Sequence, residues 1–81
     1  MRPIKRSLTI AGHRTSISLE LEFWEALAEV AAAEGTTVAA LVGRIDETRT
    51  EASAGDAGGL SGAVRVHVLR HYRKTVEAPA A

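Results

Sequence analysis

The stretch that decides the fold is Arg14-Thr15-Ser16-Ile17-Ser18-Leu19. Polar and apolar residues alternate along it, which is the pattern of a strand with one face against a core. Ile17 and Leu19 are therefore expected to face inward. The side chains expected on the opposite face are Arg14, Ser16 and Ser18. This stretch predicts a half-buried strand with a polar outer face.

A similar alternation precedes this strand, over residues 7–10. Its apolar residues lie at even positions, whereas Ile17 and Leu19 lie at odd positions. One flat strand cannot bury both pairs on the same face, because side chains alternate strictly along a strand. We therefore predict a turn or a bulge near Gly12.

Two amphipathic helices are predicted after the strand. Apolar residues recur at helical spacing over residues 23–31, and Gly35 follows as a stop. Thr36 or Thr37 then caps a second helix, which carries its own apolar stripe and ends near Thr50.

The region after the second helix is less regular. Residues 52–59 are small, Gly-rich and without periodicity, which is typical of a linker. An apolar stripe over residues 60–72 then favours a third helix, with Ser61 as its cap, although the alternation over residues 64–68 also fits a strand. The segments we expect are a basic N-terminal arm (1–6), a core of ribbon and two helices (7–50), a Gly-rich linker (51–60), a third helix (61–74) and a disordered tail (75–81).

Composition limits the size and class of the protein. The chain has 81 residues, of which 46% are hydrophobic and 4% aromatic, and it has no cysteine. This suffices for one domain with a modest aliphatic core, for which association with a second copy is an economical source of stability. The lack of cysteine fits a reducing interior, and no apolar run suggests a signal peptide or a membrane span. We therefore expect a cytoplasmic protein without a membrane partner.

Charge is unevenly distributed along the chain, although the formal net charge is zero. Residues 1–14 contain four basic side chains and no acid, whereas residues 20–34 contain five glutamates and no lysine or arginine. Such segregation suits a protein that presents one basic surface to phosphates.

The order of strand, helix, short turn and helix resembles the ribbon-helix-helix (Arc/CopG/MetJ-like) family of DNA-binding domains. Residues 14–19, the helix from Phe23, the turn at residues 35–38 and the second helix carry the resemblance. The block from Arg6 to Trp24 and the late stretch over residues 60–66 look like a longer bacterial variant with a third helix. The resemblance implies a mostly α-helical fold with one β-ribbon, in an intertwined homodimer whose strands pair antiparallel between subunits. Pairing with a second copy would also cover the polar edge of a lone strand.

The resemblance also implies where DNA is contacted. The base-contacting residues would be Arg14, Ser16 and Ser18. The expected phosphate contacts are Thr37 with the backbone N–H groups of Val38 and Ala39, and Lys5 and Arg6 in the basic arm. The start of the second helix suits a phosphate because its free N–H groups and its dipole attract anions.

These observations favour sequence-specific binding of double-stranded DNA by a homodimer, as a transcriptional repressor whose ribbon enters the major groove. The alternative is a protein-binding module, antitoxin-like, that acts through the third helix or the tail. A structural dimer without DNA binding also stays open, because the net charge is zero and the reading face is small.

Other motifs do not favour catalysis or metal binding. His67 and His71 have the spacing of a metal site, but the neighbouring cations Arg70, Arg73 and Lys74 would repel a metal ion. Residues 59–63 nearly copy a nucleophile elbow, but Ala63 replaces its last glycine. We therefore expect that the protein is not an enzyme and that it binds no cofactor and no metal. The second basic cluster, which consists of Arg65, Arg70, Arg73 and Lys74, is solvated, touches DNA flanks or binds an acidic partner.

Overall fold

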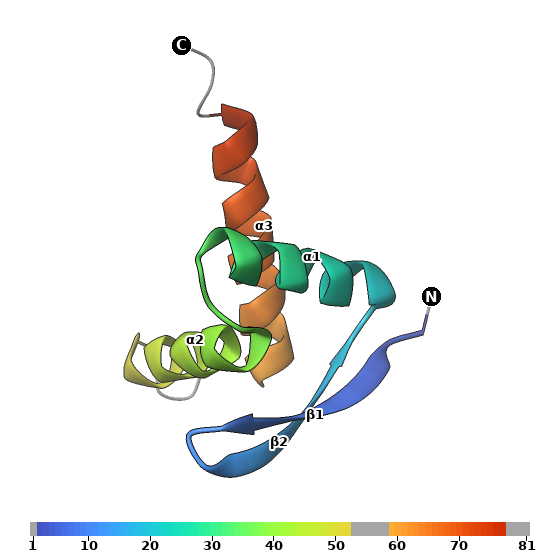
Figure 1. The fold of residues 1–81 in the computed structure, drawn as a ribbon, viewed down its shortest axis with the longest axis vertical. Helices are drawn as coiled ribbons and strands as arrows, with labels where there is room; N and C mark the ends of the chain where they lie inside the picture. The colour runs from blue at the N-terminus through green and yellow to red at the C-terminus, as the bar shows by residue number, and fades with distance from the viewer. Residues whose placement is uncertain (1, 53–58, 78–81) are drawn as a thin grey trace.

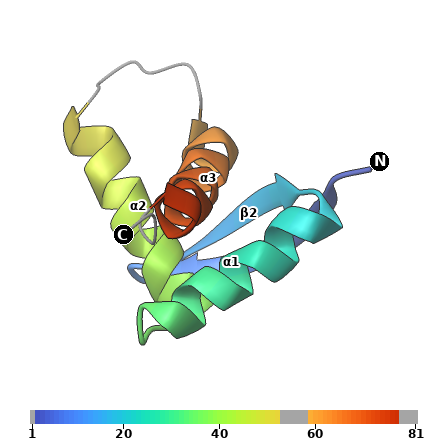
Figure 2. The same cartoon turned by 90° about the horizontal axis from the view of Figure 1, so that it is seen from above.

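The computed structural model describes residues 2–52 and 59–77, which form a β-hairpin followed by three helices (Figure 1). The elements are β1 (Ile4–Ile10), β2 (His13–Leu19), α1 (Leu21–Ala33), α2 (Val38–Ala52) and α3 (Gly59–Glu77). All three helices contact the hairpin, α2 through β1 and α1 and α3 through β2. Seen from above, α3 lies between α1 and α2 (Figure 2).

The hairpin explains the change of parity in the sequence. Ala11 and Gly12 form a two-residue turn, and both have positive φ angles, 52° and 83°. This is the signature of a type I′ turn, whose twist matches that of the flanking strands. Each pair in the register joins an even position with an odd one, such as Ile10 with His13, so both apolar sets share one face. The predicted turn near Gly12 is confirmed.

The strand β1 begins earlier than the sequence pattern indicates. Residues 4–6, which we assigned to the N-terminal arm, belong to β1. β2 therefore has a partner strand within its own chain. A second copy is thus not needed to cover that edge of β2, and only the edge that faces away from β1 is open to another strand.

The first two helices lie where the sequence predicts them, although α1 begins at Leu21, two residues before Phe23, and α2 ends at Ala52, two residues after Thr50. The carbonyl of Glu20 accepts the N–H groups of Phe23 and Trp24 at 2.9 and 3.0 Å, which starts α1. Gly35, with φ of 72°, follows its end. Thr37 rather than Thr36 caps α2, because its Oγ1 accepts the N–H of Ala40 at 3.1 Å.

The third helix is longer than expected. It spans Gly59–Glu77, so residues 75–77 are helical rather than part of a tail, and Ser61 lies inside the helix instead of capping it. The strand alternative over residues 64–68 is excluded, because these residues lie within α3. Most of the expected linker, residues 53–58, and the end of the expected tail, residues 78–81, lie outside the described residues.

One apolar core unites the hairpin and the helices. Its buried members are Ile10, Ile17, Leu19, Trp24, Leu27, Val30, Ala31, Leu41, Val42, Ile45, Val64 and Val68. Every element supplies at least one of them, so α3 is part of the core and not an appendage. Within residues 2–52 and 59–77 no single helix is long and apolar enough to cross a membrane, and α1 with α2 meets that test only as a pair bent by 93°.

Candidate nucleic-acid interface

The outer face of the hairpin, which points away from the core, is entirely polar. Its six side chains are Lys5, Ser7 and Thr9 from β1, and Arg14, Ser16 and Ser18 from β2. Five of them are exposed and Ser18 is half-buried. The structure therefore brings the three residues predicted on β2 onto one face, as the alternation indicated.

The register arranges this face as three cross-strand pairs. Thr9 lies opposite Arg14 near the turn, and Lys5 lies opposite Ser18 at the other end. Between them, the hydroxyl oxygens of Ser7 and Ser16 are 3.4 Å apart. A cation thus stands at each end of a row of hydroxyl groups, which donate and accept hydrogen bonds. Such a surface can bind phosphates and the polar edges of bases.

Sequence reasoning missed Ser7 and Thr9 as members of this face. The turn could have revealed them, because a two-residue turn at Ala11-Gly12 fixes which residues of the two strands lie opposite each other. Once the register is fixed, Ser7 must oppose Ser16 and Thr9 must oppose Arg14.

Arg6 does not join Lys5 on the outer face. It lies opposite Ile17 on the inner face, and its guanidinium carbon is 5.0 Å from the centre of the Trp24 ring. The Trp24 indole also donates a hydrogen bond to the carbonyl of Ile4 at 2.8 Å. Arg6 is therefore held along the side of the hairpin by a cation–π contact.

At the far end of β2, an arginine of α3 holds the strand. The Arg65 guanidinium donates to the Glu20 carboxylate at 3.0 to 3.3 Å, and it lies 3.5 Å from the carbonyl of Ser18. Its central carbon is 5.7 Å from the centre of the Phe23 ring. The pKa of Glu20 is lowered from its ordinary value, chiefly by its own backbone N–H and then by Arg65.

The start of α2 has the geometry expected of a phosphate contact. Thr37 is exposed, and the N–H groups of Val38 and Ala39 belong to the first turn, where no helical carbonyl can accept them. The positive end of the helix dipole lies at the same place. This part of the prediction rests on backbone groups and does not depend on a charged side chain.

Glu34, at the end of α1, is bonded to an arginine and a histidine. It accepts hydrogen bonds from Arg44 of α2 and from His67 Nε2 of α3, the latter at 3.0 Å. Both bonds lower the pKa of Glu34, and the bond from His67 has the larger effect. His67 is thus directed at a carboxylate, while His71 contacts the Tyr72 ring edge-on with centres 5.0 Å apart.

The glutamates of α1 do not face the outer surface. The buried side of α1, with Trp24, Leu27 and Val30, packs toward the hairpin and the other helices. Glu22 and Glu25 are exposed on its other side. The sheet and α1 itself therefore separate these carboxylates from the polar face of the hairpin.

Acid should weaken the fold through Glu20 and Glu34. Their pKa values are lower in the folded chain than the ordinary value of 4.5, so the unfolded chain takes up protons first as the pH falls. Their contribution to stability is complete above pH 4.5 and is lost as the pH falls through the lowered values. Urea unfolding at pH 7 and pH 3 should show the double variant Glu20→Gln/Glu34→Gln less stable than wild type at pH 7, with a smaller difference at pH 3.

The matched control is Glu22→Gln/Glu25→Gln, which removes two exposed glutamates that make no ion pair within the described residues. Its stability should follow that of the wild type at both pH values. Equal stability of wild type and Glu20→Gln/Glu34→Gln at pH 7 would contradict the role of these two carboxylates.

Comparison with known proteins gives one family and one similar structure. A family model described as a ribbon-helix-helix domain matches residues 3–72. Among solved structures, an uncharacterized protein from Bordetella pertussis Tohama I is similar, with a TM-score of 0.78 and 33% sequence identity. The alignment covers 94% of this chain but 60% of that protein, so the chain spans about three-fifths of its relative's length. A search of curated proteins finds no match.

Proposed function

Because the chain belongs to the ribbon-helix-helix family, we propose that it binds double-stranded DNA as a homodimer and represses transcription. The observation that carries this proposal is the outer face of the hairpin, where two cations and four hydroxyl groups are presented together. The face contains no carboxylate that would repel the phosphates of DNA.

In the proposed dimer, two hairpins join through the open edges of their β2 strands. Backbone groups of an antiparallel strand point alternately to its two edges, and the Ser18 carbonyl, which meets Arg65, belongs to the open edge. The same edge therefore carries the backbone groups of Arg14 and Ser16, which are available to the partner strand. A two-fold axis at this edge places both β2 strands at the centre and a β1 strand on each side.

This arrangement assigns different contacts to the two strands. The major groove is about 12 Å wide and neighbouring strands are about 4.8 Å apart, so the two central β2 strands fit between its walls. Arg14, Ser16 and Ser18 then reach base edges, with Arg14 suited to the two acceptors of guanine. The β1 strands lie over the groove walls, where Lys5 meets phosphates.

The start of α2 supplies the remaining contacts to the DNA phosphates. Thr37 and the N–H groups of Val38 and Ala39 would hold a phosphate beside the ribbon, as free N–H groups at a helix start commonly do. Arg6 is not included, because it is stacked on Trp24 at the inner face.

The test compares DNA binding by the wild type and by Arg14→Gln. Fluorescence anisotropy on a mixed-sequence duplex, over a salt series, should show binding by a dimer that weakens steeply with salt. Arg14→Gln should bind this duplex more weakly than the wild type does, by about 1–3 kcal/mol for each guanine that Arg14 reads in it. If Arg14 instead meets a phosphate, the salt slope should fall by about one for each phosphate it neutralises. Light scattering reports the oligomeric state.

Arg70→Gln is the matched control, because it removes the same charge from an exposed site on α3. It should leave DNA affinity within about twofold of the wild type, as expected for a residue outside the interface. A dimer with no measurable affinity at low salt, or equal weakening in both variants, would refute the proposed interface.

A second function, binding of a partner protein through α3, is favoured by one observation. Val66, Leu69 and Val76 are 44%, 55% and 78% exposed, and they recur at helical spacing along α3. Exposed apolar side chains in a row are typical of a protein contact. Removing α3 cannot test this role, because Val64 and Val68 belong to the core. Leu69→Ser leaves the core intact and should abolish partner binding without changing DNA affinity.

A further inference from the structure

Helix α3 carries apolar side chains on two opposite sides. Val64 and Val68 are buried in the core, whereas Val66, Leu69 and Val76 are exposed. A surface helix usually has one apolar stripe, toward the core, and is polar on its other side. The exposed side chains are not needed to pack α3 against this chain, so their apolar character favours a contact with another molecule.

The exposed side chains belong to a line with regular spacing. Gly62, Val66, Leu69, Arg73 and Val76, which we call the outer stripe, follow one another at intervals of four, three, four and three residues. Residues with this spacing form the seam along which two helices pack. The outer stripe is about 21 Å long, because a helix rises about 1.5 Å per residue. A partner helix of about four turns would cover it.

Gly62 marks the point where a partner could approach most closely. Glycine inside a helix is less favourable than alanine. A Cβ atom added to Gly62 would meet nothing within 4 Å, so packing within the described part of the chain does not require a glycine there. The lack of a side chain instead leaves room for the backbone of a second helix.

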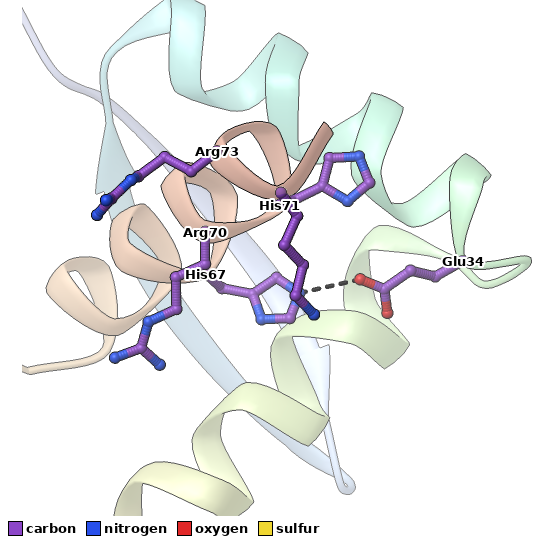
Figure 3. A pocket seen from close by; sticks show the side chains of 6 residues that line it. Glu34, His67, Arg70, His71 and Arg73 are labelled. Carbon is purple, nitrogen blue, oxygen red and sulfur yellow. Dashed lines mark hydrogen bonds and ion pairs between the residues drawn. The ribbon is translucent and has the colours of Figure 1, made fainter. Parts of the chain in front are cut away.

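The charge beside the outer stripe is positive. Residues 59–76 contain four basic side chains and no acid. In the close view of the hollow between α3 and the α1–α2 turn, Arg70 and Arg73 extend to the side of α3 away from Glu34 (Figure 3). Arg70 makes no ion pair within residues 2–52 and 59–77. A partner on this side therefore meets apolar groups with cations next to them.

The carboxylates of neighbouring elements bond to other side chains of α3. Glu20 is bonded to Arg65, and Glu34 to His67 at 3.0 Å. Glu29 accepts a hydrogen bond from the hydroxyl of Tyr72 at 2.6 Å. These three contacts join α3 to the rest of the chain, and none of them involves a residue of the outer stripe.

We propose that the outer stripe binds an amphipathic α-helix of another protein, with apolar side chains along its seam and carboxylates on its borders. The apolar side chains cover Val66, Leu69 and Val76, and the carboxylates pair with Arg70 and Arg73. The proposal names the partner for the second function given above and rests on that function, but it does not depend on DNA binding. A second copy of α3 is the poorer match, because it would bring the arginines of both copies together.

The experiment titrates the full chain into two labelled synthetic peptides at pH 7 and constant ionic strength. Both peptides have about three heptads with leucine along the seam, and their borders carry glutamate in one and lysine in the other. Fluorescence anisotropy should show that the acidic peptide binds about tenfold more tightly or better. In ¹H–¹⁵N NMR, saturable shifts with the acidic peptide should concentrate at residues 62–76.

Variants of exposed residues locate the contact. Leu69→Ser should weaken binding of the acidic peptide by about tenfold or more, as expected for a central apolar contact. Leu21→Ser is the matched control, the same substitution at an exposed leucine of α1, and should bind as the wild type does. Gly62→Gln should leave the chain at least as stable in urea and yet weaken binding, because its side chain would stand in the way of the partner backbone. Arg70→Glu/Arg73→Glu should reverse the preference between the two peptides.

The outcomes separate this inference from the functions proposed above. Equal binding of both peptides that is lost in Leu69→Ser would refute the acidic partner and leave α3 as a protein contact. Binding of neither peptide, or shifts spread over the hairpin, would refute both. Assembly of the wild type beyond a dimer, abolished by Leu69→Ser, would assign the outer stripe to a second copy of the chain. Arg14→Gln should bind the acidic peptide as the wild type does, whatever its affinity for DNA.

Discussion

Leu27→Ala is expected to lower the free energy of unfolding by about 2–5 kcal/mol, the range for a leucine truncated in a close-packed core. Leu27 is 0% exposed and belongs to the buried cluster that joins the hairpin to the helices. Small domains have a total stability of about 5–15 kcal/mol, so this single change removes much of it. Urea unfolding measured by circular dichroism should show a lower midpoint with an unchanged slope.

The matched control is Leu21→Ala, the same substitution at an exposed position of the same helix. It should change the free energy of unfolding by no more than about 0.5 kcal/mol. Similar destabilisation in both variants would mean that the cost arises from helix α1 itself and not from the core, which would contradict the packing described above.

The sequence predicts the helices and the turn because their signals are local. Gly12 and Gly35 both have positive φ angles at the places where a turn and a helix end are expected. Thr37 caps α2 with its own side chain. Each of these features depends on residues within a few positions of one another, so the pattern of the chain is sufficient to find them.

The start of β1 could not be found in the same way. Arg6 occupies an inner-face position between Ile4 and Leu8, so the alternation of polar and apolar residues breaks there. The strand continues because its backbone pairs with β2 as far as Ile4 opposite Leu19, and the Arg6 guanidinium lies over the Trp24 ring, 5.0 Å from its centre. An interaction between residues so far apart in the chain leaves no periodic trace in the sequence.

The candidate DNA interface was partly predictable for the same reason. Strict alternation places Arg14, Ser16 and Ser18 on one face, as the structure shows. Their neighbours Ser7 and Thr9 require the register, which depends on the turn. The bond between Arg65 and Glu20, 45 positions apart, joins α3 to the end of the hairpin, and a charge pattern does not reveal such a pair.

Val64→Asp should have an even larger effect on stability, by a different mechanism. Val64 is 0% exposed in the part of α3 that packs against the rest of the core. An aspartate there would place a charge in an apolar site that offers no partner. An uncompensated buried charge costs about 3–5 kcal/mol of folding free energy. The chain can avoid this cost only by a folded state in which α3 is detached. Urea unfolding should show the destabilisation, and hydrogen exchange should show which helices lose protection.

Val66→Asp is the matched control, because Val66 is 44% exposed and only two positions along the same helix. It should keep the stability and exchange protection of the wild type to within about 0.5 kcal/mol. Because Val64 shares its core with Leu27 and Leu41, we expect Val64→Asp to lower protection in α1 and α2 as well as in α3. Loss of protection in α3 alone would instead show that the hairpin, α1 and α2 fold as a unit without it.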